Sequence, residues 1–157
     1  MEPLQNVGKC ESMIIHFAAA FRMRRKMSRR EIREHIFKLL FLAEFHEREE
    51  LEEQVRLYLA QHEEIKDEDL NYITTKYHKI LNLLQEIDAK IDQVSRGWKI
   101  DRMGKTDLTV LRLAYYEMQY DDEIPTGVAI NEGVELAKLF GREESPAFVN
   151  GILAKLV

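Results

Sequence analysis

One stretch in the middle of the chain decides the fold class, residues 70–94, which read LNYITTKYHKILNLLQEIDAKIDQV. Apolar residues recur there at alternating spacings of three and four positions, which follows one face of an α-helix and differs from the every-second pattern of a strand. The stripe consists of Leu70, Ile73, Tyr77, Ile80, Leu84, Ile87, Ile91 and Val94. The acidic residues 67–69 precede it, where negative charge suits the positive end of a helix dipole. We therefore predict a single long helix over this stretch.

Helical patterns also occur on the N-terminal side of this stretch. Ser28 and Glu31 have the spacing of a capping box, which predicts that a helix begins at Ser28. A shorter helix is expected over residues 49–62. The pattern breaks near Gly97, so three helices are predicted before that point.

Three more helices are expected after the break. Periodic apolar residues predict helices over residues 107–120 and 126–140, the second of them ended by Gly141. Ser145-Pro146 then supplies an N-cap with proline at the first helical position, so a last helix is expected to run from there to the end of the chain.

The composition supports an all-helical protein. The 157 residues are 45% hydrophobic and include 7 glycines and 3 prolines, which excludes a disordered chain and disfavours turn-rich all-β folds. We expect residues 28–157 to form a single domain with sub-bundles at about 28–96 and 97–157. Residues 1–27 are expected to be an N-terminal extension that is either disordered or the result of a mis-assigned start codon.

Cysteine usage and hydropathy indicate the compartment. Cys10 is the single cysteine, so neither an intrachain disulfide nor a cysteine-based zinc site can form. The longest apolar stretch, residues 13–21, is less than half a membrane span, and the acidic segment before it has the wrong polarity for a signal peptide. We expect a cytoplasmic protein without a membrane anchor.

Charge is distributed unevenly along the chain. The net charge is −5, yet residues 22–33 contain one acid and seven basic residues, which are Arg22, Arg24, Arg25, Lys26, Arg29, Arg30 and Arg33. In a helix that begins at Ser28, the last three gather on one side, where guanidinium groups can bind phosphate oxygens or stack on bases. Three alternatives stay open from the residues alone: nucleic acid, which is favoured, a membrane surface or acidic protein, and no partner.

The sequence contains no catalytic or metal-binding signature. Its five histidines never have the His-x-x-x-His spacing of a helical zinc site, and no glycine-rich phosphate loop occurs. A charge-rich helical surface accounts for the many acidic residues. We therefore expect no catalytic residues, no metal, no cofactor and no enzymatic activity.

Two features of the last helices bear on a binding site. Phe148 lies off the apolar stripe of its helix, so it either stacks on a base at the surface or fills the core. Asn131, Glu132 and Asn150 are polar residues in otherwise apolar helices. Since buried polar groups must be paired, we expect hydrogen bonds among them to join the last two helices.

Several motifs resemble the NusB family of transcription antitermination factors. In the second half they are DLTVLRLAYYE at residues 107–117, Ile124-Pro125, VAINEGVELAKLFG at residues 128–141 and FVNG at residues 148–151. The helix from Ser28 to Phe41 is similar to the arginine-rich first helix of that family, and the resemblance extends to about Leu156. It implies an all-α fold of two three-helix bundles packed at a steep angle, with an N-terminal arm.

The resemblance also implies a function without catalysis. Members of the family pair with NusE, a small-subunit ribosomal protein, and the pair binds the single-stranded boxA element of nascent ribosomal RNA. The expected role is therefore to help assemble an antitermination complex with the other Nus factors on RNA polymerase. The preferred RNA sequence and the formation of a homodimer stay open.

Site residues follow from the resemblance position by position. It implies RNA contacts for Arg29, Arg30, Arg33, Glu144 and Phe148, and a NusE-facing surface that includes Phe41 and Asp107. Further RNA contacts would come from Arg22, Arg24, Arg25 and Lys26, for which the family offers no counterpart. Two departures are Ala147, where a basic residue can occur, and Phe41, which lacks the hydroxyl of a tyrosine.

Two alternatives to this function have different sequence requirements. A helical adaptor without RNA function would use the arginines to bind an acidic protein. The RNA-binding domain of ribosomal RNA cytosine methyltransferases would require a downstream S-adenosylmethionine-binding domain, whereas this sequence stops at Val157.

Overall fold

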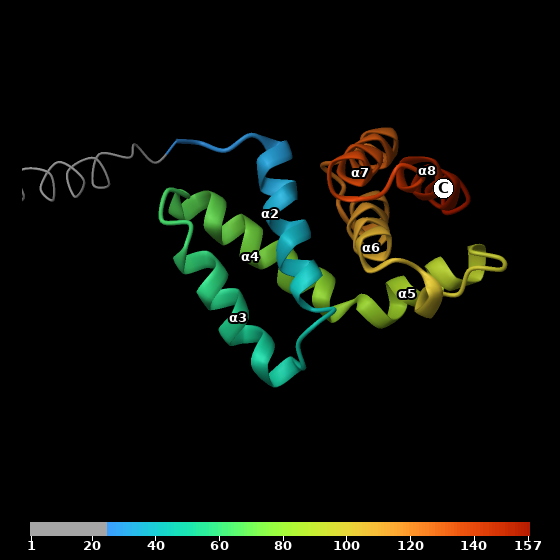
Figure 1. Ribbon diagram of the computed structural model, residues 1–157. Helices are drawn as coiled ribbons and strands as arrows, with labels where there is room; N and C mark the ends of the chain where they lie inside the picture. The colour runs from blue at the N-terminus through green and yellow to red at the C-terminus, as the bar shows by residue number, and fades with distance from the viewer. Residues whose placement is uncertain (1–24) are drawn as a thin grey trace, which may run out of the picture.

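The computed structural model describes residues 25–157 (Figure 1), and all regular structure in this range is helical. Its seven α-helices and one short 3-10 helix are α2 (Arg29–Leu42), α3 (Arg48–Ala60), α4 (Asp67–Asn82), α5 (Leu84–Val94), the 3-10 turn (Ile100–Arg102), α6 (Lys105–Tyr120), α7 (Thr126–Phe140) and α8 (Ser145–Ala154). The all-α prediction is confirmed. The expectations for Arg22 and Arg24 concern residues outside the described range.

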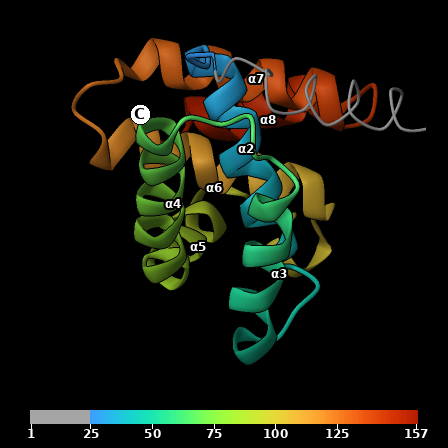
Figure 2. The same ribbon diagram turned by 90° about the vertical axis from the view of Figure 1, so that its left-hand side faces the viewer.

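The helices form two groups whose axes cross steeply. In Figure 2, α3 and α4 run vertically while α7 and α8 cross above them nearly horizontally. Helix α2 packs against α3 and α4 and also against α6, so it joins the two groups. Helix α6 packs against α7 and α8, and α5, which lies below α6 in Figure 1, packs against both α6 and α4. The predicted crossing of two helical bundles is confirmed, with α5 as an additional helix at their junction.

The prediction of one helix over residues 70–94 is wrong, because the chain bends between α4 and α5. Leu83 has φ −102° and ψ 4°, and its N–H donates to the carbonyl of Ile80 at 3.0 Å. The apolar stripe continues across the bend because both halves bury it, α4 against α2 and α5 against α6. A hydrophobic period identifies which residues are buried but not the neighbour that buries them, so it gives no sign of this bend.

The start of α2 is the predicted capping box. Ser28 Oγ accepts from the N–H of Glu31 at 3.2 Å, and Oε2 of Glu31 accepts from the N–H of Ser28 at 2.8 Å. Two of the N–H groups that a helix leaves unpaired at its start are thereby satisfied. The first helical residue is consequently Arg29, which fixes the direction in which each arginine of α2 points.

The turn between α7 and α8 is tight and requires glycine. A Cβ on Gly141 would lie 2.5 Å from Cβ of Ser145 and 2.6 Å from the carbonyl oxygen of Ala137, so no side chain fits. Gly141 is the predicted C-cap of α7. The predicted N-cap of α8 is one residue off, because the cap is Glu144 and Ser145 Oγ instead accepts from the N–H of Arg142 at 2.9 Å.

The apolar core runs through both helix groups. Among its fully buried side chains are Ile36, Leu39, Leu40, Ile73, Tyr77, Ile80, Ile87, Ile91, Leu111, Leu113 and Leu153. Since α2, α4, α5, α6 and α8 all contribute, the two groups share one continuous core. No helix within residues 25–157 combines the length and the apolar character that a membrane span requires.

Candidate nucleic-acid interface

The arginines at the start of α2 differ in exposure. Arg29 and Arg30 occupy the first turn and are exposed, whereas Arg33 is only 6% exposed. Three or four residues of helix therefore separate guanidinium groups that face solvent from one that lies among buried side chains. The structure brings Arg29 and Arg30 together at the surface, whereas the side chain of Arg33 beside them is buried.

Arg33 is held by two carboxylates of the other helix group. Its Nε donates to both carboxylate oxygens of Glu117 in α6, at 3.1 and 3.0 Å, and its Nη1 lies 3.4 Å from Oε2 of Glu132 in α7. Glu132 also accepts from Nε and Nη2 of Arg30, at 3.3 and 3.2 Å. Arg33 thus anchors α2 to α6 and α7, and one carboxylate is shared by a buried and an exposed arginine.

A second cation, Lys76 of α4, neutralises the buried Glu117. Lys76 Nζ donates to Oε1 of Glu117 and to Oδ2 of Asp121, each at 2.9 Å. Burial by itself lowers the pKa of Lys76, but Glu117 and then Asp121 outweigh burial, so the pKa is raised and the ammonium stays charged. We call Arg33, Glu117, Lys76 and Asp121 the buried ion network; it connects α2, α4 and α6.

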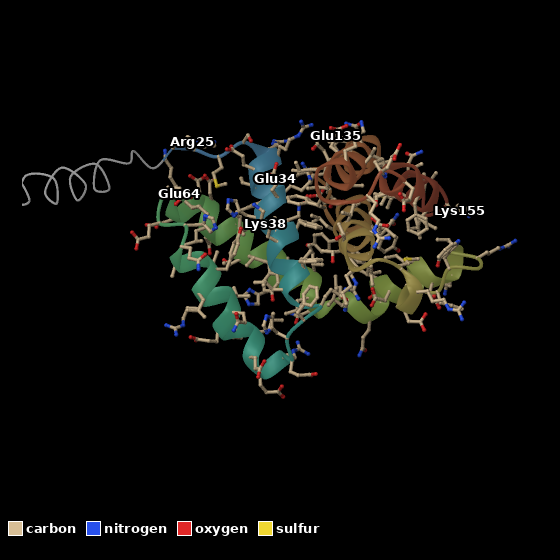
Figure 3. The ribbon with its side chains drawn as sticks, viewed as in Figure 1. Arg25, Glu34, Lys38, Glu64, Glu135 and Lys155 are labelled. Carbon is tan, nitrogen blue, oxygen red and sulfur yellow. The ribbon has the colours of Figure 1, made fainter. Side chains whose placement is uncertain are left out.

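The segment before α2 carries another paired arginine. Arg25 forms an ion pair with Glu31, in which Nη1 lies 3.2 Å from Oε2. Hydrogen bonds from Arg25, and then from the backbone and hydroxyl of Ser28, lower the pKa of Glu31 to about 2. Figure 3 shows Arg25 on this segment, and Glu34 and Glu64 line the same small cavity, so its surroundings are acidic.

The accessible positive charge is therefore smaller than the sequence indicates. Arg25, Arg30 and Arg33 form ion pairs, whereas Lys26 and Arg29 form none within the described part of the chain. The Arg30 pair is exposed, and exposed pairs contribute little energy, so an anion can replace the carboxylate there. We call Lys26, Arg29 and Arg30 the basic edge.

A second surface feature lies where the α5–α6 connection meets the start of α8. Trp98 is 59% exposed and packs edge-to-face against Phe148, with ring centroids 6.5 Å apart and ring planes at 73°. The two rings line a cavity of about 600 Å³, which we call the aromatic pocket. Its charged lining residues are Arg102, Lys105, Asp107, Arg142 and Glu144. Aromatic rings beside cations are typical of surfaces that bind single-stranded nucleic acid.

Phe148 combines the two roles that the sequence left open. It is half-buried and packs against the core, yet its ring also lines the aromatic pocket. Glu144, the N-cap residue of α8, is exposed and lines the same pocket. The structure therefore brings Glu144 and Phe148 together, at a place distinct from the basic edge.

Helix α7 fixes the spacing between the two features. Glu132 in its middle pairs with Arg30, and Phe140 at its end lines the aromatic pocket. The eight positions between them correspond to roughly 12 Å along a helix axis. Phe140 also stacks on Phe37 of α2, with ring centroids 4.6 Å apart, which holds the two helices together along this path.

The residues implied as partner-facing also lie near one another. Phe41 is half-buried and packs against Phe45, which is 57% exposed, with ring centroids 5.0 Å apart. Lys105 Nζ lies 5.1 Å from the centre of the Phe45 ring, two positions before Asp107. Oδ1 of Asp107 is buried and has no hydrogen-bond partner among the described residues.

One prediction about the last two helices is wrong. Asn131 and Asn150 are exposed and form no hydrogen bond with each other, and Glu132 points to α2 instead of α8. The contact between α7 and α8 is apolar and close, since a Cβ on Gly133 would lie 3.2 Å from Cδ1 of Leu153. A polar residue in an amphipathic helix shows that a partner is needed but not which helix supplies it.

Sequence reasoning also missed Trp98, which it treated as part of a connector. The signal was present, because Trp98 is the single tryptophan and lies among Arg96, Lys99, Arg102 and Lys105 in an acidic chain. An exposed large aromatic within a basic loop indicates a binding surface. Within residues 25–157 no group of three or more histidine, cysteine, aspartate or glutamate side chains is placed to hold a metal ion.

Comparisons with known proteins agree on one family. A family model described as the NusB family matches residues 30–157. Proteins called transcription antitermination protein NusB are 53% identical in Lachnoclostridium phytofermentans, over 83% of this chain and 99% of that protein, and 51% identical in Agathobacter rectalis, over 82% and 98%.

Solved structures show the same fold. The crystal structure of NusB from T. maritima is 33% identical with a TM-score of 0.73, and the match covers 84% of this chain and 92% of that one. A chain from a crystal structure of the antitermination factors NusB and NusE in complex with double-stranded RNA has the same fold, with a TM-score of 0.68 at 24% identity over 82% of this chain and 94% of that one.

Proposed function

The chain belongs to the NusB family of transcription antitermination proteins, and from this premise we propose that it binds single-stranded boxA-type RNA together with NusE. In this role it helps assemble the antitermination complex, with the other Nus factors, on RNA polymerase in the cytoplasm. It acts by binding and catalyses no reaction.

The observation that carries the proposal is the exposed basic edge at the start of α2. Arg29 and Arg30 present two guanidinium groups on adjacent positions of one helix turn, and Lys26 precedes them without an ion pair in the described structure. Guanidinium forks bind phosphate oxygens in a bidentate manner. The basic edge therefore binds the phosphates of the RNA backbone, whereas Phe148 and Glu144 contact the nucleobases.

Arg33 has a supporting part in this proposal. Its guanidinium is buried against Glu117, so it reaches RNA only after these contacts are rearranged. It shares Glu132 with Arg30, however, and so affects where Arg30 is held before RNA arrives. We therefore propose that Arg33 positions the basic edge.

The NusE-facing surface of the proposal is the neighbourhood of Phe41 and Asp107. Phe45 extends the apolar part of Phe41 to the solvent, and Lys105 places a cation over the Phe45 ring. A surface with an exposed aromatic anchor beside a cation suits a protein partner.

The test is RNA binding as a function of salt, with and without NusE. If the chain neutralises about three to five phosphates, the log–log salt slope of affinity is about −2 to −3.5 for a single strand. We expect weak, salt-dependent binding by the chain alone and tighter, boxA-preferring binding once NusE is added, measured by gel shift against a scrambled RNA of equal length.

The same measurement separates the proposal from its main alternative. Affinity that does not depend on salt contradicts an interface built on phosphates. A chain that binds NusE but gives no RNA complex under any condition is a helical adaptor, which is the alternative function.

A further inference from the structure

Two aromatic residues of the aromatic pocket, Trp98 and Phe140, are assigned to RNA binding by neither the family resemblance nor the sequence, and Trp98 is the exposed one of the two. We propose that Trp98 is a second base-stacking residue of this pocket, beside Phe148, and that it holds an unpaired nucleobase of single-stranded RNA. The inference rests on the proposed RNA-binding function and extends it to a specific site in the α5–α6 connection.

The first argument is the exposure of Trp98. An indole is among the largest apolar side chains, and the core would gain from burying it, yet 59% of it is in solvent. Phe148 meets it edge-to-face, at an interplanar angle of 73°, so this contact covers at most one face of the indole. A flat aromatic ligand can therefore stack on the exposed indole face.

The second argument is that the backbone around Trp98 is fixed. Gly97 has φ +83°, and the N–H of Trp98 donates to the carbonyl of Ser95 at 3.1 Å, which makes a tight turn directly after α5. Asp92 then accepts from the N–H of Ile100 at 3.3 Å. A ring on a fixed turn loses little conformational freedom on binding, so stacking contributes to affinity without a large ordering cost.

The third argument is charge. Arg96 lies two positions before Trp98, and Arg102 and Arg142 line the pocket itself, whereas the whole chain carries a net charge of −5. Arg102 and Arg142 form no ion pair within residues 25–157, so they are available to phosphate oxygens. Cations that stay unpaired in an acidic protein indicate an anionic ligand.

The carboxylates in the pocket favour a nucleotide over a simple anion. Asp107 and the exposed Glu144 line the same cavity as the arginines. Carboxylates accept from the exocyclic amino groups of bases, as they do from cytosine. Rings for stacking, arginines for phosphate and carboxylates for amino groups are together the chemistry of a single-stranded nucleic-acid site. The volume, about 600 Å³, is that of an ordinary ligand pocket.

The experiment uses the fluorescence of the full chain, in which Trp98 is the single tryptophan. Titration with a short single-stranded RNA should quench this fluorescence in parallel with binding, which is followed independently by the anisotropy of labelled RNA. Trp98→Leu should weaken RNA binding by about 5- to 150-fold, since stacking of one base on an aromatic ring contributes about 1–3 kcal/mol. Trp98→Phe, which keeps a ring, should restore most of the affinity.

A matched control is Leu57→Ala, which removes an exposed apolar side chain on α3, remote from the pocket. It should leave RNA affinity unchanged. Thermal unfolding of each variant distinguishes a lost contact from a damaged fold, and we expect Trp98→Leu to unfold within a few degrees of the wild type, because its side chain is exposed.

Three results would overturn the inference. If RNA binds without quenching the fluorescence of the wild-type chain, and Trp98→Leu binds RNA with unchanged affinity, Trp98 does not stack, and the proposed function stands. If NusE alone, and not RNA, changes the fluorescence, the pocket is a protein-docking surface. If RNA binds in neither the presence nor the absence of NusE, the RNA function fails and the Trp98 site with it.

Discussion

The basic edge and the aromatic pocket differ in how much of their charge is available. At the start of α2 the sequence is densely basic, yet Arg25, Arg30 and Arg33 are paired with carboxylates. Around Trp98, Lys99 and Lys105 are paired with carboxylates, but Arg102 and Arg142 have no ion pair in the described structure. The count of basic residues therefore overstates the available charge of both regions, and it does so more strongly at the start of α2.

The difference arises from what surrounds each region. Helix α2 is the element that joins the two helix groups, so it is buried against α4 and α6 and also contacts α7. An arginine on that face is desolvated and needs carboxylate partners, which Glu117 and Glu132 supply. The α5–α6 connection lies at the periphery, and its basic side chains stay hydrated.

The largest effect on stability that we expect comes from removing Glu117, the carboxylate that neutralises the buried cations. Glu117→Ala leaves Arg33 and Lys76 buried with one neutralising partner each at most, so it should lower the free energy of unfolding by about 3–5 kcal/mol. Urea unfolding at neutral pH measures the change. The matched control Glu135→Ala removes a carboxylate from an exposed pair with Lys138 and should cost at most about 1 kcal/mol.

A loss below about 1 kcal/mol for Glu117→Ala would show that the buried ion network adds nothing beyond a surface pair. Arg33 would then have no stabilising role in its buried position. The role that the family resemblance implies for it, a direct contact with RNA, would be favoured instead. The slope of free energy against urea should stay constant, since an altered slope would indicate a changed unfolded state.

The next largest effect separates Arg33 from Arg30. Arg33→Met removes two charge-assisted hydrogen bonds but leaves Glu117 with Lys76 and Glu132 with Arg30, so we expect a loss of about 1.5–3 kcal/mol in stability. Arg30→Met removes one exposed pair and should cost less than about 1 kcal/mol. Equal losses for the two variants would contradict the division into a buried and a surface arginine.

Much of the fold could be predicted from the sequence because local signals specify it. The capping box at Ser28, the apolar stripes and Gly141 each depend on neighbouring residues, and each was located within about one position. The bend at Leu83 could not be predicted, since it depends on α4 and α5 having different neighbours, and no glycine or proline marks it.

The site was predicted less completely for the same reason. Arg29, Arg30 and Phe148 could be selected from residue type and helix position, and the structure places them at the surface or half at the surface. The pairing of Arg33 with Glu117 spans 84 positions in the chain. Such contacts are set by helix packing, and the pattern of one helix carries no information about them.

A smaller effect concerns RNA and not stability. Arg29 has no ion pair in the described structure, so Arg29→Ala should leave the free energy of unfolding unchanged. If its guanidinium neutralises one phosphate, its loss makes the log–log salt slope less negative by about 0.7 and weakens binding roughly 5-fold at about 0.1 M salt. Anisotropy of labelled RNA over a range of salt measures both. An unaltered slope of log affinity against log salt concentration would show that Arg29 does not contact phosphate. The aromatic pocket would then be the main part of the interface.

The smallest effect lies away from both regions, at the contact between α2 and α3. His35 Nδ1 lies 2.7 Å from the Tyr58 hydroxyl. Burial raises the pKa of Tyr58 to about 12, so the phenol keeps its proton and shares a hydrogen bond with the neutral imidazole. Burial, and after it the charges of His62 and Lys38, lowers the pKa of His35.

The sign of the pH dependence follows from this lowered pKa. The unfolded chain, with a histidine pKa of about 6.5, takes up the proton before the folded chain does. The contribution of His35 to stability is therefore complete above about pH 6.5 and is lost as the pH falls toward the folded-state pKa. His35→Gln should flatten this part of the profile of unfolding free energy against pH, whereas the control His78→Gln, at a half-exposed histidine, should leave it in place. If the free energy of unfolding of His35→Gln depends on pH in the same way as that of the wild type, acid destabilises the protein through other groups. The contact between α2, which also carries Arg29 and Arg30 of the basic edge, and α3 would then rest on packing alone.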